Sequence, residues 1–182
     1  MPREIISLDD LTVNNVGVFK KINSVTLPTT YPEQWYKDSL TDQLVKIAFY
    51  AELPVGAIKA RAINFSAKQS YEAISSSPSA SSSATASSDT TPKILPNAVY
   101  IESLAVLKEY QGLGIGGKLL DFIIEETKRR YIHEVVLHVS TENSKAIDWY
   151  LKKGFTKKEE VKDYYKEQGL SQPDAIILSL SV

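Results

Sequence analysis

Among the side chains of this sequence that could take part in acid–base chemistry, His138 is the obvious titratable group; Tyr100 lies before a glycine-rich segment and His138 after it. Histidine titrates nearest to neutral pH, and a tyrosine hydroxyl both donates and accepts hydrogen bonds. A lone histidine or tyrosine in a strand is by default an ordinary packed residue. Residue chemistry alone therefore does not assign a catalytic role to either side chain.

The glycine-rich segment covers residues 111–117, Gln-Gly-Leu-Gly-Ile-Gly-Gly. A strand-like apolar run (99–107) precedes it, and apolar residues at helical spacing follow it, so we expect it to join a strand to a helix. Glycines permit positive φ there, and the first turn of the helix presents unpaired N–H groups that favour a phosphate. A Gly-x-Gly pair alone is weak evidence, because many such loops simply turn tightly.

The surrounding sequence separates this segment from two other phosphate-binding motifs. A P-loop requires a serine or threonine after its lysine, whereas Lys118 is followed by Leu119. A dinucleotide-binding fold requires a second βαβ unit, and none of the required kind follows. The segment instead matches Gln/Arg-x-x-Gly-x-Gly/Ala from Gln111 to Gly116.

Composition narrows the class of protein. The chain has 182 residues, which suits one domain, and a net charge of −1, which gives no basic field for direct nucleic-acid binding. It has no cysteine and only two histidines, so we expect no thiol nucleophile, no disulfide and no metal site. No signal-peptide core and no run of membrane-spanning length is found. We therefore expect a soluble intracellular protein with no membrane partner.

The order of patterned segments predicts an α/β (α+β) fold, with a mixed, mostly antiparallel sheet flanked by helices. Asp9 and Asp10 are expected to cap the first helix and Gly154 to end the last one. Strands are expected at 3–8, 44–51, 55–64, 99–107, 134–139, 155–161 and 175–180. Helices are expected at 13–25, 33–40, 118–130 and 145–153.

A serine-rich segment interrupts this order at about residues 66–97. Nine of the fourteen residues from Ser75 to Ser88 are serine. Such a segment cannot bury enough apolar surface to offset its ordering entropy. We expect a disordered loop between two adjacent strands of one sheet, so that residues 1–182 form a single domain.

Several motifs in order resemble the GCN5-related acetyltransferases, and within them the family of NatE N-terminal acetyltransferase catalytic subunits. The resemblance covers nearly the whole chain apart from the serine-rich segment. It is carried by Pro28, Tyr31, Tyr100, the Gln111 loop, Leu137-His138-Val139, residues 143–150, Gly154-Phe155 and Tyr164-Tyr165. The resemblance implies transfer of acetyl from acetyl-CoA to the α-amine of chains that begin with methionine. It also implies docking on the NatA complex, and through it on the ribosome, in the cytoplasm with the nucleus as a second location.

The resemblance also implies residue roles. Tyr100 and His138 would deprotonate the amine through ordered water, and Tyr150 would either donate a proton to the thiolate or pack beside it. The implied acetyl-CoA residues are Leu104, Ala105, Val106, Gln111, Gly112, Leu113, Gly114, Ile115, Gly116, Gly117, Asn143 and Tyr150. The implied peptide residues are Leu27, Pro28, Thr29, Tyr31, Glu102, Tyr164 and Tyr165. Glu102 stands where the family usually has an apolar residue, and it would either favour a basic second residue or point to solvent.

The chemistry leaves alternatives open. An amine can attack a thioester directly, and an α-amine, with a pKa of about 7.7–8.0, needs only a weak base. A lysine or small-amine acetyltransferase of the same fold would need similar residues. A non-catalytic structural subunit of NatA is the third alternative, but the intact glycine segment, Tyr100 and His138 argue against it.

Overall fold

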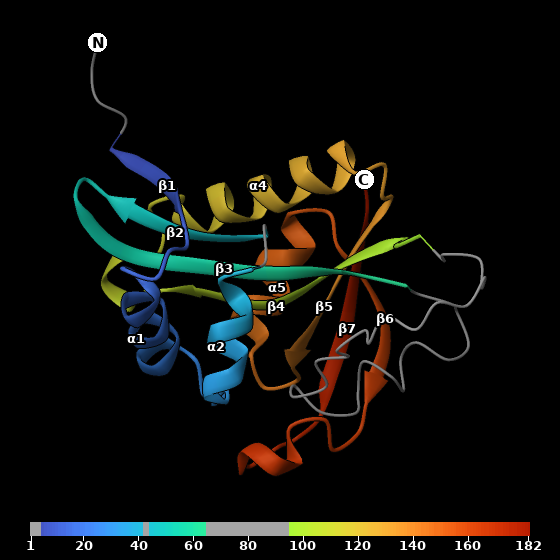
Figure 1. Ribbon diagram of the computed structural model, residues 1–182. Helices are drawn as coiled ribbons and strands as arrows, with labels where there is room; N and C mark the ends of the chain where they lie inside the picture. Colours follow the sequence, from blue (N-terminus) through green and yellow to red (C-terminus); the bar gives the residue numbers. More distant parts are fainter. Residues whose placement is uncertain (1–4, 42–43, 65–94) are drawn as a thin grey trace, which may run out of the picture.

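The computed structural model describes residues 5–41, 44–64 and 95–182, which form one seven-stranded sheet with helices on both faces (Figure 1). The strands are β1 (Ile6–Asp10), β2 (Val45–Tyr50), β3 (Leu53–Ile63), β4 (Ala98–Val106), β5 (Glu134–Ser140), β6 (Thr156–Val161) and β7 (Ala175–Ser181). The helices are α1 (Val16–Thr26), α2 (Glu33–Ser39), α4 (Ile115–Arg129) and α5 (Ser144–Lys152), with short 3-10 helices η1 (Lys108–Tyr110) and η2 (Lys166–Gln168). The expected fold class is confirmed.

The strand order is β1-β2-β3-β4-β5-β7-β6. Every neighbouring pair is antiparallel except β4 and β5, which run parallel. The last strand, β7, therefore lies between β5 and β6. The sheet is mixed and mostly antiparallel, as the sequence predicts.

The parallel pair β4–β5 separates part of the way along its length. Pairing covers only three positions and ends at Ile101 opposite Leu137, although β4 continues to Val106 and β5 to Ser140. A register shift between β3 and β4 at the same level makes Glu102 the extra residue of a β-bulge. Main-chain groups on the separated part of β4 are therefore not paired with β5.

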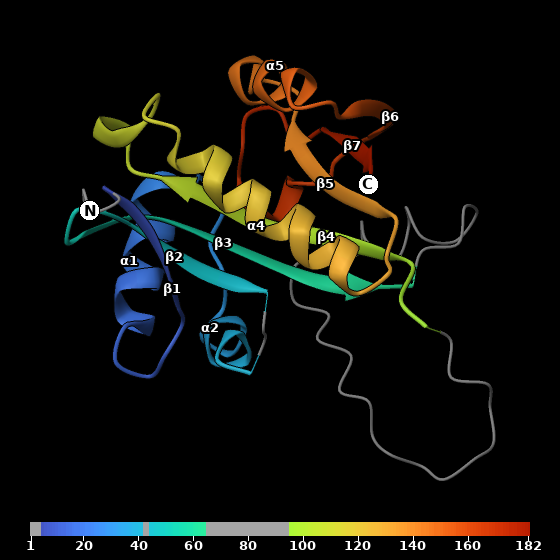
Figure 2. The ribbon, with the colours of Figure 1, turned by 90° about the horizontal axis from the view of Figure 1, so that it is seen from above.

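Helices cover both faces of the sheet. Helices α1 and α2 pack on one face through a cluster around Phe19 and Trp35, whereas α4 packs on the other across β2, β3 and β4 (Figure 2). Helix α5 contributes Ile147 and Tyr150 to the same cluster as α4. The pocket described below opens between these layers, where β4 and β5 separate.

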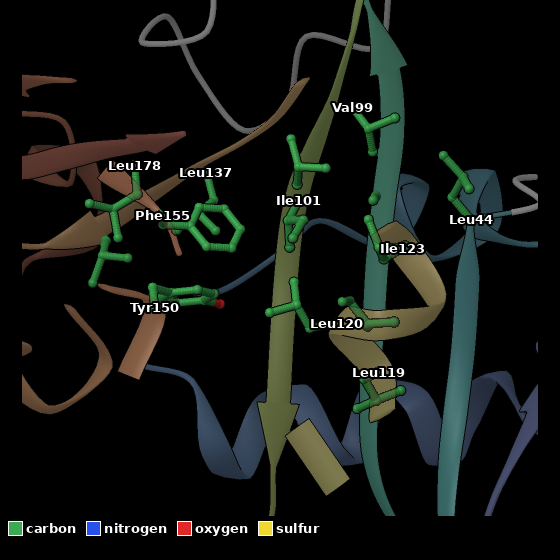
Figure 3. Packing of buried hydrophobic residues seen from close by; sticks show 14 of the residues in the cluster. Leu44, Val99, Ile101, Leu119, Leu120, Ile123, Leu137, Tyr150, Phe155 and Leu178 are labelled. Atoms are coloured by element: carbon green, nitrogen blue, oxygen red, sulfur yellow. The ribbon is translucent and has the colours of Figure 1, made fainter. Parts of the chain in front are cut away.

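The long helix α4 buries one apolar stripe. Ile115, Leu119 and Ile123 recur at a spacing of four residues and are fully enclosed. Figure 3 shows Leu119 and Ile123 with Leu120, which fills the adjacent position. Burial of each such side chain contributes roughly 1.5–3 kcal/mol relative to exposure. This stripe fixes the N-terminus of α4, and with it the glycine-rich loop, relative to the sheet.

Two local predictions were wrong. Asp9 and Asp10 do not cap α1, because both pair with β2 and Asp10 forms an ion pair with Lys46 (2.6 Å). Asn15 occupies the N-cap position instead. The turn between β2 and β3 is also shorter than the gap of residues 52–54 that was expected between these strands, since β2 ends at Tyr50 and β3 already starts at Leu53.

The serine-rich segment lies outside the described residues, except for its last three, 95–97. The strands on either side of it are neighbours: β3 and β4 pair as far as Ile63 opposite Ala98. The Asn97 N–H extends this ladder by donating to the Ile63 carbonyl oxygen at 3.0 Å. The described residues on either side of residues 65–94, up to Ile63 and from Asn97, therefore lie side by side on one sheet.

None of the helices in residues 5–41, 44–64 and 95–182 is long and apolar enough to cross a membrane. Within the same ranges, no group of three or more histidine, aspartate or glutamate side chains is placed to hold a metal ion.

Candidate active site

A cavity of about 480 Å³ opens where β4 and β5 separate, and the chain segments that line it come from seven places in the sequence. These are the α1–α2 loop, α2, β3, β4, β5, helix α5 with its N-cap, and the β6–β7 loop. Both residues expected to be catalytic line it, Tyr100 and His138. All seven expected peptide residues line it as well: Leu27, Pro28, Thr29, Tyr31, Glu102, Tyr164 and Tyr165.

Three polar side chains meet inside this cavity. The Tyr100 hydroxyl lies 3.0 Å from His138 Nδ1 and 3.0 Å from the Tyr164 hydroxyl. The His138 and Tyr164 rings stack with their centres 4.1 Å apart and their planes 2° from parallel. The hydroxyl of Tyr100 is therefore the middle of a chain of hydrogen bonds that ends at His138. The resemblance implied Tyr164 only as a residue that contacts the peptide.

Burial keeps this cluster uncharged near neutral pH. It lowers the pKa of His138 to about 4, because an imidazolium ion would lose its hydration. It raises the pKa of Tyr100 well above the ordinary value, and a lesser rise at Tyr164 has the same main cause. His138 is thus a neutral imidazole that can accept a proton, and Tyr100 is a phenol that can pass one on.

The lowered pKa of His138 predicts a pH dependence of stability. Between about pH 6.5 and 4 the unfolded chain binds a proton at His138 that the folded chain does not bind. The contribution of His138 is therefore complete above the unfolded pKa and declines as the pH falls through this window. Replacing His138 with Phe should flatten the fall in Tm between pH 7 and 5.

The matched control is His133→Gln, which removes the exposed histidine and leaves His138 in place. Thermal unfolding of the three proteins across this range provides the measurement. A His138→Phe variant whose Tm falls as steeply as that of the wild type would contradict the assignment.

An aromatic wall closes the cavity on the side of the α1–α2 loop. The Tyr31 ring stacks on Trp35 with the ring centres 4.0 Å apart. The Tyr31 hydroxyl donates a hydrogen bond of 3.0 Å to the main-chain oxygen of Glu102. The Thr29 hydroxyl lies 3.4 Å from the Tyr31 hydroxyl oxygen. Burial raises the pKa of Tyr31, so this hydroxyl stays protonated and keeps its bond to β4.

The α1–α2 loop is tied directly to the β6–β7 loop. Gln168 Oε1 accepts hydrogen bonds from the Thr30 main-chain N–H at 2.9 Å and from its hydroxyl at 3.2 Å. Gln168 also lines the cavity. The two loops that carry most of the expected peptide residues are therefore joined to each other.

Glu102 does not point to solvent. Its side chain is 12% exposed and lies between two cations, with Oε2 3.4 Å from Lys59 Nζ and Oε1 3.2 Å from Arg61 Nε. The solvent-exposed alternative for this carboxylate is therefore wrong. Its charge is balanced inside the protein before any peptide binds.

The glycine-rich loop has the geometry that a phosphate site needs. Gly112 and Gly114 have φ of +81° and +86°, and nothing lies within 4 Å of a Cβ built on either residue. Gly114 is the N-cap of α4 and no side chain caps that end, so the first N–H groups of the helix are available to an anion. Gln111 braces the loop by donating to the Val106 main-chain oxygen at 3.0 Å.

The residues expected to bind acetyl-CoA divide into those that line the cavity and those that do not. Leu104, Asn143 and Tyr150 line the cavity, and Figure 3 shows Tyr150 extending from α5 toward β4. The others do not line it: Ala105, Val106, Gln111, Gly112, Leu113, Gly114, Ile115, Gly116 and Gly117. Of these, Ala105 and Ile115 bury their side chains in the core, so only their main-chain groups could contact a ligand.

Asn143 and Tyr150 also stabilise the fold around α5. Asn143 caps α5 by accepting a hydrogen bond from the Ala146 N–H at 3.1 Å. Tyr150 packs against Trp149 and Phe155, and burial raises its pKa. Tyr150 therefore keeps its proton, which is the state required for it to donate one to a departing thiolate.

Replacing Gly114 with Ala is expected to weaken acetyl-CoA binding at least tenfold, because a Cβ would force this positive-φ turn to change and displace its N–H groups. Gly169→Ala is a matched control: Gly169 also has positive φ (+69°) and open space around it, but it lies beyond η2. Calorimetric titration of both variants with acetyl-CoA provides the measurement. Equal affinities would contradict the assignment of the loop.

Sequence reasoning missed several lining residues. Trp35 and Gln168 carry no motif of their own and become part of the site only through loop packing. Arg61 was predicted only as part of the strand at 55–64. Lys59 lies two residues before it, so the two cations share one face of the strand, and this pattern can be detected in a sequence. The Arg61 guanidinium lies 5.7 Å from the centre of the Tyr100 ring.

Comparison with known proteins agrees with this geometry. The model of the acetyltransferase (GNAT) family matches residues 23–155. The N-alpha-acetyltransferase 50 of Danio rerio is 30% identical over 97% of this chain and 89% of its own length, and the probable N-acetyltransferase san of Drosophila melanogaster is 29% identical over 98% and 82%. The solved structure of Arabidopsis thaliana Naa50 with the bisubstrate analogue CoA-Ac-MVNAL is 27% identical, with a TM-score of 0.75 over 98% of this chain and 100% of that one. The chain therefore belongs to the GNAT family of acetyltransferases, and within it to the family of N-alpha-acetyltransferase 50.

Proposed function

We propose that this enzyme acetylates the free α-amine of polypeptides that begin with methionine, with acetyl-CoA as the acetyl donor. The observation that carries the proposal is the hydrogen-bonded cluster of Tyr100, His138 and Tyr164 at the point where β4 and β5 separate. Support comes also from family membership and from the analogue bound to Arabidopsis thaliana Naa50, which joins CoA to a peptide that begins with methionine.

Different parts of this chain would align acetyl-CoA, remove the proton of the amine and protonate the leaving thiolate. Bound acetyl-CoA supplies an activated thioester. The main-chain groups of β4 beyond Ile101, which are not paired with β5, would align its arm. An attacking amine becomes acidic as its bond to carbon forms, so even a weak base can remove its proton. Tyr100 would pass this proton to His138 directly or through one water, and Tyr150 would protonate the leaving thiolate.

The first side chain of the peptide would lie against Leu27 and Pro28, opposite Tyr165. A methionine-sized side chain buried there gains roughly 1.5–3 kcal/mol over a glycine. The proposal therefore includes selectivity for the first residue. Selectivity for the second residue depends on the charges around Glu102.

Kinetics on two peptides with free α-amines, one beginning Met-Leu and the other Ser-Glu, test this function. We expect kcat/KM for the Met-Leu peptide to exceed that for the Ser-Glu peptide at least tenfold, which corresponds to about 1.4 kcal/mol of the burial energy. Mass spectrometry locates the acetyl group on the first residue. Equal rates would contradict selection by the first side chain.

The partners and location are part of the same proposal. The substrates are the N-termini of nascent or finished chains, and docking on the NatA complex would bring the enzyme to the ribosome, in the cytoplasm with the nucleus as a second location. The support is the resemblance to NatE catalytic subunits. Co-purification of the tagged chain with the NatA auxiliary subunit, followed by ribosome sedimentation and cell fractionation, tests these statements; a chain that sediments alone would contradict them.

A further inference from the structure

Lys59 lies beneath the peptide pocket without being among the residues that line it. Its side chain is only 5% exposed. An ammonium group removed from water to this extent requires a nearby anion or polar groups, since the loss of hydration is costly. Its partners connect it to both sides of the pocket.

Four residues form a closed ring of contacts. Lys59 Nζ lies 3.4 Å from Glu102 Oε2, an ion pair rather than a short hydrogen bond, and donates to the Trp35 main-chain oxygen at 3.2 Å. The same ammonium lies 4.0 Å from the centre of the Trp35 ring, at the distance of a cation–π contact. Trp35 stacks on Tyr31, and the Tyr31 hydroxyl bonds back to the Glu102 main chain. The ring ties the α1–α2 wall to the bulge of β4.

The charged side chains around Glu102 also affect the electrostatics of the pocket. Lys59 and Arg61 both approach the Glu102 carboxylate, so the negative charge of Glu102 faces two cations. Of these three residues, Glu102 and Arg61 line the pocket. Asp163, Lys166 and Glu167 line it too, but all three are exposed at its mouth, where water and salt screen them.

We propose that Lys59 is a positioning residue that sets the peptide specificity of this enzyme. It holds the Tyr31–Trp35 wall against β4 and neutralises Glu102 from below, so that the pocket favours a neutral or acidic second residue over a basic one. The inference rests on the proposed acetylation of N-terminal methionine. It contradicts the simple expectation that Glu102 selects a basic residue.

The test compares Met-Glu and Met-Lys peptides in wild type and in Lys59→Met, which keeps the length of the side chain but removes its charge. Wild type should favour Met-Glu. In Lys59→Met the ratio of kcat/KM for Met-Glu to that for Met-Lys should fall about tenfold, because one positive charge near the pocket is lost. The KM for peptides should rise severalfold, whereas the KM for acetyl-CoA should stay within about twofold.

Three further variants separate specificity from a general loss of structure. Lys46→Met is the matched control, since Lys46 also pairs with a carboxylate (Asp10) and lies 5.1 Å from the centre of an aromatic ring (Phe122), but on β2 and away from the pocket. It should leave the peptide ratio unchanged. Glu102→Gln should shift the ratio toward Met-Glu, and Lys59→Met combined with Glu102→Gln should return it near the wild-type value.

Calorimetric titration of the CoA-bound enzyme with both peptides measures selectivity without turnover. If wild type binds the peptides with a preference that Lys59→Met reverses but acetylates neither, the proposed function fails and the inference on Lys59 stands. If wild type acetylates them and Lys59→Met keeps the same ratio in both assays, the inference is overturned and the function stands. If Lys59→Met unfolds, Glu102→Gln provides the test. A shift of its kcat/KM ratio toward Met-Glu supports the inference, and an unchanged ratio overturns it.

Discussion

A His138→Ala variant is expected to bind acetyl-CoA normally and to lose between about 10²- and 10⁴-fold in kcat, the range typical of a positioned proton acceptor. The reason is geometric, because His138 Nδ1 ends the hydrogen-bond chain through Tyr100. Among the described residues, no other side chain forms a hydrogen bond with Nδ1. The KM for peptides should change much less, because proton removal belongs to the transition state. Stopped-flow or discontinuous kinetics on a Met-Leu peptide measures both parameters.

Tyr100→Phe should give a loss in kcat of similar size, since it removes the central hydroxyl and keeps the ring. If the two residues act as one unit, the double variant should lose little more than the worse single variant. His133→Ala is the control, because it removes the other histidine of the chain outside the cavity. A folded His138→Ala enzyme with less than threefold loss in kcat would remove His138 from the mechanism.

Much of the fold could be predicted because hydrophobic periodicity is a local property. The stripe of α4, the strand before it and the glycine loop between them are all visible in residues 99–130, and the structure places each within a few residues of the prediction. The position of β7 between β5 and β6 was not predicted, since strand order depends on which edges remain unpaired after the rest has folded. Asp10 shows the same limit: its ion pair with Lys46 spans 36 residues.

The candidate site shows the same division. Tyr100 and His138 were found because they lie on strands with recognisable neighbours. The contact of Tyr164 with Tyr100 spans 64 residues and depends on how the β6–β7 loop folds back. The pairing of Lys59 with Glu102 depends on a β-bulge, and a bulge changes which side chains face each other without leaving a pattern in the sequence.

A peptide with a blocked N-terminus and an internal lysine is expected to react at least about 100-fold more slowly than a Met-Leu peptide with a free α-amine. Part of the difference is intrinsic, because the α-amine has a pKa of about 7.7–8.0 and the lysine side chain about 10.4, so far less lysine is in the reactive form near pH 7. The neutral, buried His138 cannot compensate, since its pKa of about 4 makes it too weak a base to deprotonate a lysinium ion beforehand.

The rest of the difference is steric. Thr30 and Gln168 join the two loops beside the cavity, so a chain that continues in both directions from its reactive residue meets this connection, whereas a chain end does not. Gln168→Ala should therefore raise the rate on the internal-lysine peptide relative to the Met-Leu peptide. Gln34→Ala, which removes an exposed glutamine of α2 bonded only to Asp38 in the described structure, should leave the ratio unchanged. Comparable rates on the two peptides in wild type would replace N-terminal acetylation with lysine acetylation, because both the ionisation and the joined loops would then have failed to select the chain end.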